Sequence, residues 1–190
     1  MKLFLPASDN LTSICKGVNV VAMLNIPLVL ALMLAGLSVG SLDQSGSAGV
    51  QSAQEKLVLS YFHDVLDGGK IDLIDNMFQP DCELHFGSSD VHRITGVHLM
   101  VERIKTTYSS LATEVHDIFE SEDRVVVRLT HRATGAGALR TRIGTYDVNG
   151  KTITWDAIVI FRMKNGKIAE EWVNRDELGV LLSAGILRAN

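Results

Sequence analysis

Four polar residues in the second half of the chain carry the side chains that proton-transfer chemistry needs. Asp156, Glu170 and Asp176 lie in or next to strand-like runs, and His131 lies among alternating apolar residues. Burial against an apolar wall raises the pKa of a carboxyl group because it disfavours the charged form. Such a group can take a proton from the carbon beside a carbonyl near neutral pH. These residues therefore point to general acid/base catalysis.

Alternation along the last strand-like run indicates which of its polar groups turn inward. Ile168 and Trp172 favour burial, and unbroken alternation places Glu170 and Asp176 on the same face as this pair. A bulge near the end of the strand would shift this register. Glu170 and Asp156 therefore remain alternatives to Asp176 as the base. Asp176 would equally serve as the N-cap of the helical tail that follows it.

His131 is the second candidate for chemistry. It shares one strand face with Val125, Val127 and Leu129, which makes this the more apolar side of the strand. The imidazole either hydrogen-bonds a substrate oxygen or is a histidine whose hydrogen bonds are satisfied within the core.

Aromatic and histidine side chains supply the candidate substrate contacts. We expect these at His85, Trp155, Trp172, Phe62 and Tyr61. Trp155 and Asp156 are adjacent, so only one of the two can face a pocket. Both faces of their strand are apolar beyond this point, which predicts a central strand covered on both sides.

The sequence lacks the motifs of several classes of chemistry. The histidines form no i,i+4 helical pair and no HExxH run, so we expect no metal. The sequence contains no GxGxxG, P-loop or GxSxG, and we expect no cofactor. A net charge of -4 argues against binding to nucleic acid, which requires a basic surface.

The hydrophobicity of the chain is concentrated at its N-terminus. The mean hydropathy is +0.18, and residues 18–39 contain no charged side chain. Roughly 20 apolar residues can span a bilayer as a helix. Residues 1–40 are therefore predicted to be a secretory signal or a membrane anchor, unless Met23 is the true start. The protein is then secreted, periplasmic or membrane-anchored through this segment alone, and cytoplasmic if the segment is not functional.

A small polar linker and one folded domain are predicted to follow. The linker covers residues 41–53 and the domain residues 54–190. Only Cys82 lies in the domain, because Cys15 belongs to the leader, so no intramolecular disulfide is expected. Apolar periodicity predicts helices over residues 54–66, 70–78, 96–111 and 176–187. Strands are predicted over residues 82–86, 113–121, 124–134, 140–146, 152–163 and 167–174. Helices followed by a strand meander indicate an α+β fold.

The order of these elements resembles the SnoaL-like (polyketide cyclase/ester cyclase) branch of the NTF2-like superfamily over about residues 54–187. The motifs that carry the resemblance are Asp67-Gly68-Gly69, Phe78-x-Pro80-Asp81-x-x-x-His85, and the closing run with Phe161-Arg162, Gly166-Lys167-Ile168, Glu171-Trp172 and Asp176. The segment after His131 departs from the family, because it reads Arg132-Ala133-Thr134-Gly135-Ala136-Gly137 where relatives often carry a longer loop.

The resemblance implies a cone made by a curved antiparallel or mixed sheet, with about three helices over a hydrophobic pocket. It implies a cofactor-free cyclase, isomerase or dehydratase acting on a small hydrophobic carbonyl compound. The alternative is a non-catalytic module for ligand binding or dimerisation. In the cyclases an aspartate late in the chain acts as the base, and Asp176 matches it. His85 stands where the family often has histidine. Homodimerisation through the convex sheet face is expected from the same resemblance.

Overall fold

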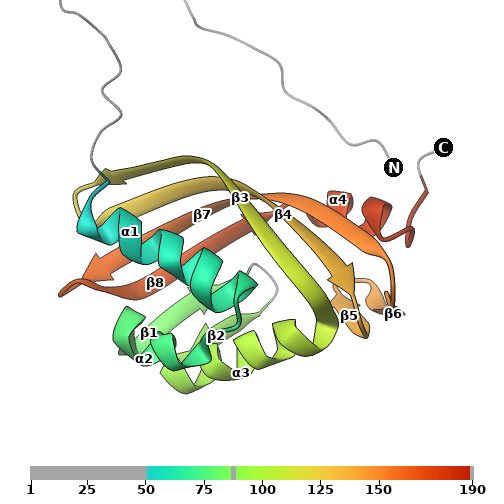
Figure 1. The fold of residues 1–190 in the computed structure, drawn as a ribbon, viewed down its shortest axis with the longest axis horizontal. Helices are drawn as coiled ribbons and strands as arrows, with labels where there is room; N and C mark the ends of the chain where they lie inside the picture. Colours follow the sequence, from blue (N-terminus) through green and yellow to red (C-terminus); the bar gives the residue numbers. More distant parts are fainter. Residues whose placement is uncertain (1–50, 87–88, 189–190) are drawn as a thin grey trace, which may run out of the picture. The chain divides into compact units, whose positions relative to one another are not determined.

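The first helix of the domain is capped at its N-terminus by two side chains. In the computed structural model, which describes residues 51–86 and 89–188, α1 spans Ala53–Ser60 (Figure 1). Ser52 Oγ accepts a hydrogen bond from the backbone N–H of Glu55, and the Glu55 carboxylate accepts one from the N–H of Ser52. This reciprocal capping box fixes where the helix begins. The predicted leader, residues 1–40, lies outside the described residues. Within the described ranges, no helix combines the length and apolarity needed to cross a membrane.

The helices of the domain follow the predicted apolar periodicity, with shifted ends. After α1 the chain continues as a π-helical segment η1, Tyr61–Asp67, which ends at Gly68. A short turn η2, Ile71–Leu73, leads into α2, Ile74–Met77. The third helix, α3, spans Arg93–Thr107 rather than residues 96–111, because the strand β3 already begins at Tyr108.

Six strands form one mixed sheet in the order β2-β1-β8-β7-β4-β3. Their bounds are Phe78–His85 for β1, Asp90–His92 for β2, Tyr108–Ser121 for β3, Arg124–Gly135 for β4, Thr152–Lys164 for β7 and Lys167–Arg175 for β8. Among the strands of the described residues, only β1 and β8 pair in parallel, and the other neighbours are antiparallel. The α+β class and the curved mixed sheet are as predicted.

The sheet curves around the helices, and its inner face carries the core. Figure 1 shows β3, β4, β7 and β8 arching over α1, α2 and α3. Along β4 the buried residues alternate with more exposed ones, in the order Val125, Val127, Leu129, His131 and Ala133. This is the side of the strand that the sequence predicted to be apolar. The alternation leaves the opposite, outer face of the sheet facing away from the helices.

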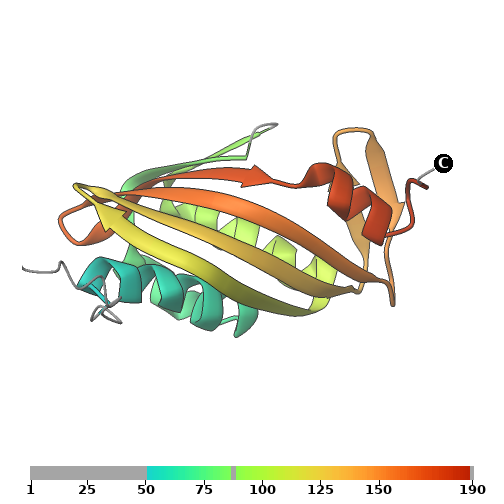
Figure 2. The ribbon, with the colours of Figure 1, turned by 90° about the horizontal axis from the view of Figure 1, so that it is seen from above.

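A second hydrophobic cluster closes the end of the sheet away from α1. The helix α4, Glu177–Ser183, lies against the start of β7, as Figure 2 shows from above. Lys151 Nζ donates to the carbonyl oxygen of Ala184 at 2.9 Å, which ties the chain after α4 to the start of β7. Buried side chains shared by this end include Tyr108, Leu139, Trp155 and Val180.

Two sequence predictions about strands are wrong. The single strand predicted over residues 140–146 is a separate hairpin of β5, Ala138–Thr141, and β6, Gly144–Asp147. Gly144 has φ +151°, a conformation that favours glycine and lets the chain reverse there. The strand β7 is also not covered on both sides, since Ile158 on its outer face is 46% exposed.

Candidate functional site

Three side chains from separate segments form a continuous hydrogen-bonded relay on the inner side of the sheet. Asp67 ends η1, Thr113 lies on β3 and His131 lies opposite it on β4. The Thr113 hydroxyl donates to Asp67 Oδ1 at 2.8 Å, and the backbone N–H of Thr113 donates to Asp67 Oδ2 at 2.9 Å. Thr113 Oγ1 and His131 Nδ1 lie 2.9 Å apart. We call Asp67, Thr113 and His131 the Asp–Thr–His relay.

The relay fixes the tautomer of the imidazole. A threonine hydroxyl has one hydrogen, and Thr113 gives it to the carboxylate of Asp67. Thr113 Oγ1 must therefore accept the hydrogen carried by His131 Nδ1. A neutral imidazole protonated at Nδ1 presents an unprotonated lone pair at Nε2. The carboxylate thus acts on His131 through the hydroxyl and leaves Nε2 as the basic atom.

Burial keeps His131 neutral. The residue is 8% exposed, and desolvation lowers the pKa of its imidazole to about 4, with a smaller contribution from the positive charge of Arg175. The imidazole centroid lies 5.0 Å from the Trp155 ring and 6.1 Å from the Phe62 ring. Aromatic side chains therefore lie on two sides of the imidazole and limit its access to water.

A cation and a phenol lie at the same end of the sheet. The charge of Arg175 acts on both His131 and Tyr108, and burial raises the pKa of the Tyr108 hydroxyl. Arg175 binds Glu177 through Nε at 3.0 Å, so its position is fixed by the first turn of α4. Tyr108 packs against Trp155 with ring centroids 5.8 Å apart. The positive charge of Arg175 therefore favours the neutral imidazole of His131 and opposes the effect of burial on the pKa of the Tyr108 hydroxyl.

Two hollows open to the surface beside these residues. One, of about 190 Å³, has Asp67 and Tyr108 in its lining, so it reaches one end of the relay. The other, of about 310 Å³, lies by Asp156, Asp176 and Arg175, where the end of β8 meets the middle of β7, and outer-face residues of β4 and β7 line it. Neither is the closed apolar pocket that the resemblance implies.

The structure places Asp176 and Asp156 outside the buried interior. Asp176 is the N-cap of α4, and its Oδ1 accepts a hydrogen bond from Gly179 N–H at 2.8 Å. Asp156 is exposed and accepts a hydrogen bond from the Thr130 hydroxyl at 2.6 Å. The capping alternative for Asp176 is thus the contact observed, and both carboxylates border the open hollow instead of an apolar cavity.

The inward carboxylate of β8 is Glu171, and the predicted inward face with Glu170 and Trp172 is wrong. The β7–β8 register shifts between the Arg162–Glu170 and Met163–Ile168 pairs. This irregularity buries both Ile168 and Ala169 and then turns Glu171 inward. Beyond such a bulge every side chain changes face.

Glu171 is buried beside aromatic side chains of the core. It is 3% exposed, and its carboxylate accepts a hydrogen bond from Tyr61 Oη at 3.4 Å. Desolvation raises the pKa of Glu171 to about 8, so it is mostly protonated at neutral pH. The rings of Phe62 and Phe161 contact one another and Tyr61, with centroids 5.5 to 6.0 Å apart. Phe62 also contacts His131, so an aromatic layer lies between Glu171 and the relay.

The predicted substrate contacts divide between the two faces of the sheet. Trp155, Phe62 and Tyr61 are buried on the inner side. His85 and Trp172 lie on the outer side, where their rings stack at 5.6 Å with an interplanar angle of 20°. They cannot contact a ligand of the relay, because alternation along β1 and β8 turns their side chains away from the core.

Sequence reasoning missed three of the residues that the structure brings together. The sequence identifies Asp67 only as part of the Asp67-Gly68-Gly69 motif, although its position before two glycines places a carboxylate at a helix end. Thr113 is an ordinary β-branched strand residue and gave no signal. Glu171 lies next to the predicted Glu170, and only the bulge distinguishes them.

The curved mixed sheet over α1, α2 and α3 is the fold that the resemblance to NTF2-like domains implies. The sequence profile described as SnoaL-like polyketide cyclase matches residues 56–183, and the chain belongs to this family. No curated protein sequence matches the chain.

Solved structures show the same fold at low sequence identity. TsrD from Streptomyces laurentii is 21% identical with a TM-score of 0.63, over 73% of this chain and 100% of that one. A putative SnoaL-like polyketide cyclase from Jannaschia sp. CCS1 is 17% identical with a TM-score of 0.61, over 74% and 99%. An LEH-like epoxide hydrolase from M. tuberculosis is 12% identical with a TM-score of 0.57, over 70% and 90%. These similarities establish the fold.

Proposed function

We propose that this chain catalyses cofactor-free proton transfer on a small hydrophobic carbonyl compound, with His131 as the base. The observation that carries the proposal is the Asp–Thr–His relay, which leaves Nε2 of a buried neutral imidazole unprotonated. The family includes proteins described as polyketide cyclases, which agrees with a carbonyl substrate. The proposed base is therefore His131 instead of Asp156, Glu170 or Asp176.

The reaction balances without a redox partner. His131 Nε2 takes the proton from the carbon beside the carbonyl, and the C–H electron pair forms an enolate. In this proposal the enolate oxygen is stabilised by Arg175, whose charge acts on His131, and by the hydroxyl of Tyr108, whose ring packs on Trp155. The enolate carbon then attacks a second carbonyl of the same molecule, and the imidazolium returns its proton to the new alkoxide. Return of the proton to a different carbon gives isomerisation instead.

A base whose pKa is near 4 is competent for this chemistry. Carbonyl isomerisation proceeds with carboxylate bases of pKa about 4 to 5 when donors stabilise the enolate oxygen. The pKa of His131, about 4, leaves the imidazole unprotonated through the physiological range. Turnover by this base is therefore expected to be flat above pH 6 and to fall as the pH approaches 4.

A non-catalytic ligand-binding module is the second candidate. Its supporting observation is that both hollows are open, while the ring of Trp155 lies against His131. In such a module the relay would hold β3, β4 and η1 together and perform no proton transfer.

The test is exchange of the acidic proton of β-keto esters in D₂O, followed by NMR, with the full chain. His131→Gln keeps a partner for Thr113 but lacks the base, so the enzyme-dependent exchange rate is expected to fall by about 10²- to 10⁴-fold. Asp176→Asn is the matched comparison and is expected to retain the wild-type rate. An unchanged rate in His131→Gln would refute the assignment. Loss of exchange in Asp176→Asn alone would return the base to Asp176. Ligand binding without exchange by the wild type would favour the binding module.

A further inference from the structure

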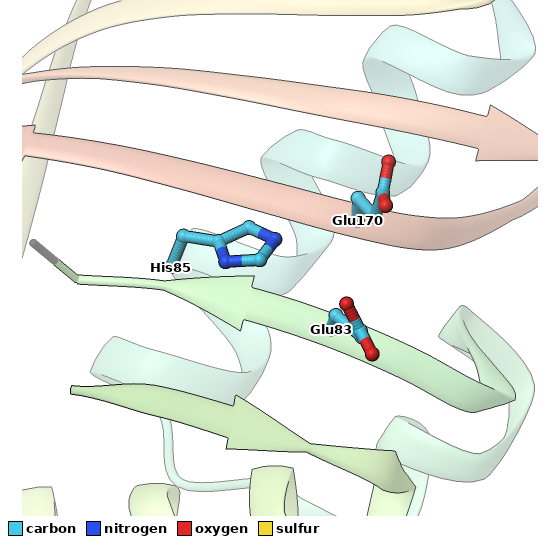
Figure 3. Close-up of side chains that lie close together, drawn as sticks. All are labelled: Glu83, His85 and Glu170. Carbon is cyan, nitrogen blue, oxygen red and sulfur yellow. The ribbon is translucent and has the colours of Figure 1, made fainter.

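Potential metal ligands converge on the outer face of the sheet, away from the relay. Glu83 and His85 of β1 and Glu170 of β8 each offer one ligand atom, and these atoms lie within 4.8 Å of one another. Figure 3 shows a ring nitrogen of His85 on the side that faces the two carboxylates. We call Glu83, His85 and Glu170 the outer cluster.

The strand topology creates the outer cluster from distant segments. The parallel pairing of β1 with β8 sets Glu83 directly beside Glu170 and His85 beside Trp172. Residues two apart on β1 share a face, so His85 joins the two carboxylates. Two like charges placed opposite each other on neighbouring strands destabilise a sheet. A cation bound between them removes this repulsion.

The imidazole of His85 is oriented as metal-binding histidines are. Its Nδ1 lies 3.2 Å from Asp90 Oδ1 on β2, which leaves Nε2 as the nitrogen available to an ion. The ring also stacks on Trp172, which restricts its rotation. Metal-bound histidines almost always give their second nitrogen to a carboxylate, carbonyl or water in this way. Asp90 is thus an outer partner of the cluster.

We propose that the outer cluster binds one divalent transition-metal ion of the zinc class, with Glu83, His85 and Glu170 as ligands. One imidazole nitrogen and two carboxylate oxygens suit Zn²⁺ or Co²⁺ better than the oxygen-only preference of Mg²⁺ and Ca²⁺. Tetrahedral ligands at Zn–N and Zn–O distances of about 2.0 to 2.2 Å are about 3.4 Å apart. The ligand atoms of the outer cluster lie up to 4.8 Å apart, and small rotamer changes of the partly exposed glutamates bring them to the shorter separation. Water completes the coordination.

Arg162 competes with the ion. Its Nε donates to Glu170 Oε2 at 2.6 Å, and this bond lowers the pKa of Glu170. An ion at the outer cluster must share or displace that contact, so removal of the guanidinium is expected to tighten metal binding. A bound ion would join β1 to β8 at the only parallel pairing in the described sheet.

The test is titration of the metal-free full chain with Co²⁺, followed by visible absorption, and with Zn²⁺, followed by calorimetry. One ion per chain is expected for the wild type. His85→Gln and Glu83→Gln should each lower affinity by about tenfold or more, as should Asp90→Asn. Arg162→Gln should raise it several-fold. His98→Gln is the matched control, since His98 is similarly exposed and also pairs with a carboxylate, Asp75, at 2.9 Å. The His98→Gln variant should bind Co²⁺ and Zn²⁺ with the affinity of the wild type.

Three results would overturn the site. The first is no Co²⁺ or Zn²⁺ binding by the wild type at millimolar concentration. The second is wild-type affinity in both His85→Gln and Glu83→Gln. The third is loss of binding in His98→Gln but not in His85→Gln, which would locate the ion elsewhere. The proton-exchange assay of His131 is independent of all three, because the outer cluster and the relay lie on opposite faces of the sheet.

Discussion

Replacement of His131 by glutamine is expected to make the fold less sensitive to acid. The unfolded imidazole has its ordinary pKa of 6.5, whereas burial lowers the folded value to about 4. Between these values the unfolded chain binds a proton that the folded chain does not. The free energy of unfolding therefore falls as the pH drops from 6.5 to 4, and levels off below. The shift corresponds to about 3 kcal/mol, at roughly 1.4 kcal/mol per pKa unit.

Urea denaturation of wild type and His131→Gln at several pH values measures this contribution. All other titrating groups are common to both proteins, so their effects cancel in the difference between the two stabilities. Relative to the variant, the wild type should lose about 3 kcal/mol between pH 7 and pH 4. Equal denaturant slopes would show that the unfolded states are comparable. If the stabilities of the two proteins change in parallel with pH, His131 is not held neutral by burial and the reasoning fails.

Three further predictions concern the other polar groups. Glu171→Gln should stabilise the fold at pH 7 by about 3 kcal/mol, because the raised pKa of about 8 costs stability as pH rises above 4.5. Urea denaturation should show this gain vanish below pH 4.5, and a gain that persists there would contradict it. Asp176→Ala should lower the free energy of unfolding by about 1 kcal/mol, because Asp176 caps α4 by accepting the hydrogen bond from Gly179 N–H. No loss on calorimetry would mean that the cap is dispensable. Thr113→Val should cost about 1 to 3 kcal/mol in urea, because Asp67 and His131 lose a shared partner. Wild-type stability of this variant would show that water replaces the hydroxyl.

The regular elements of this fold could be predicted because their signals are local. The apolar repeat of Leu57, Tyr61 and Val65 identifies the first helix, and Asn165-Gly166 identifies the turn between β7 and β8. Both residues of that turn have positive φ, 51° and 74°, as a tight hairpin turn requires. The family resemblance followed from the order of such elements.

The candidate site could be predicted only in part because it depends on long-range register. His131 was found from simple alternation in an unbroken strand. Glu170 was chosen over Glu171 because the irregularity near Ala169 is visible only when β8 is paired with β7. Thr113 gains its role solely from the β3–β4 register, which sets it beside His131. A helical pair of histidines would be visible in the sequence, whereas Glu83 and Glu170 meet only through a parallel strand pair.

The π-helical turns of η1 hold more residues than α-helical winding needs for the same rotation. A π-helical hydrogen bond joins residues i and i+5 instead of i and i+4, so each turn contains about one extra residue. The seven residues of η1 therefore turn through about the same angle as one residue fewer would in an α-helix. Deletion of the exposed His63 would let the segment wind as an α-helix and leave the residues on both sides in their present directions. The Val58 side of α1 would keep its packing, and Asp67 would still reach Thr113. The segment thus tolerates a change of length by one residue without loss of either the helix packing or the relay.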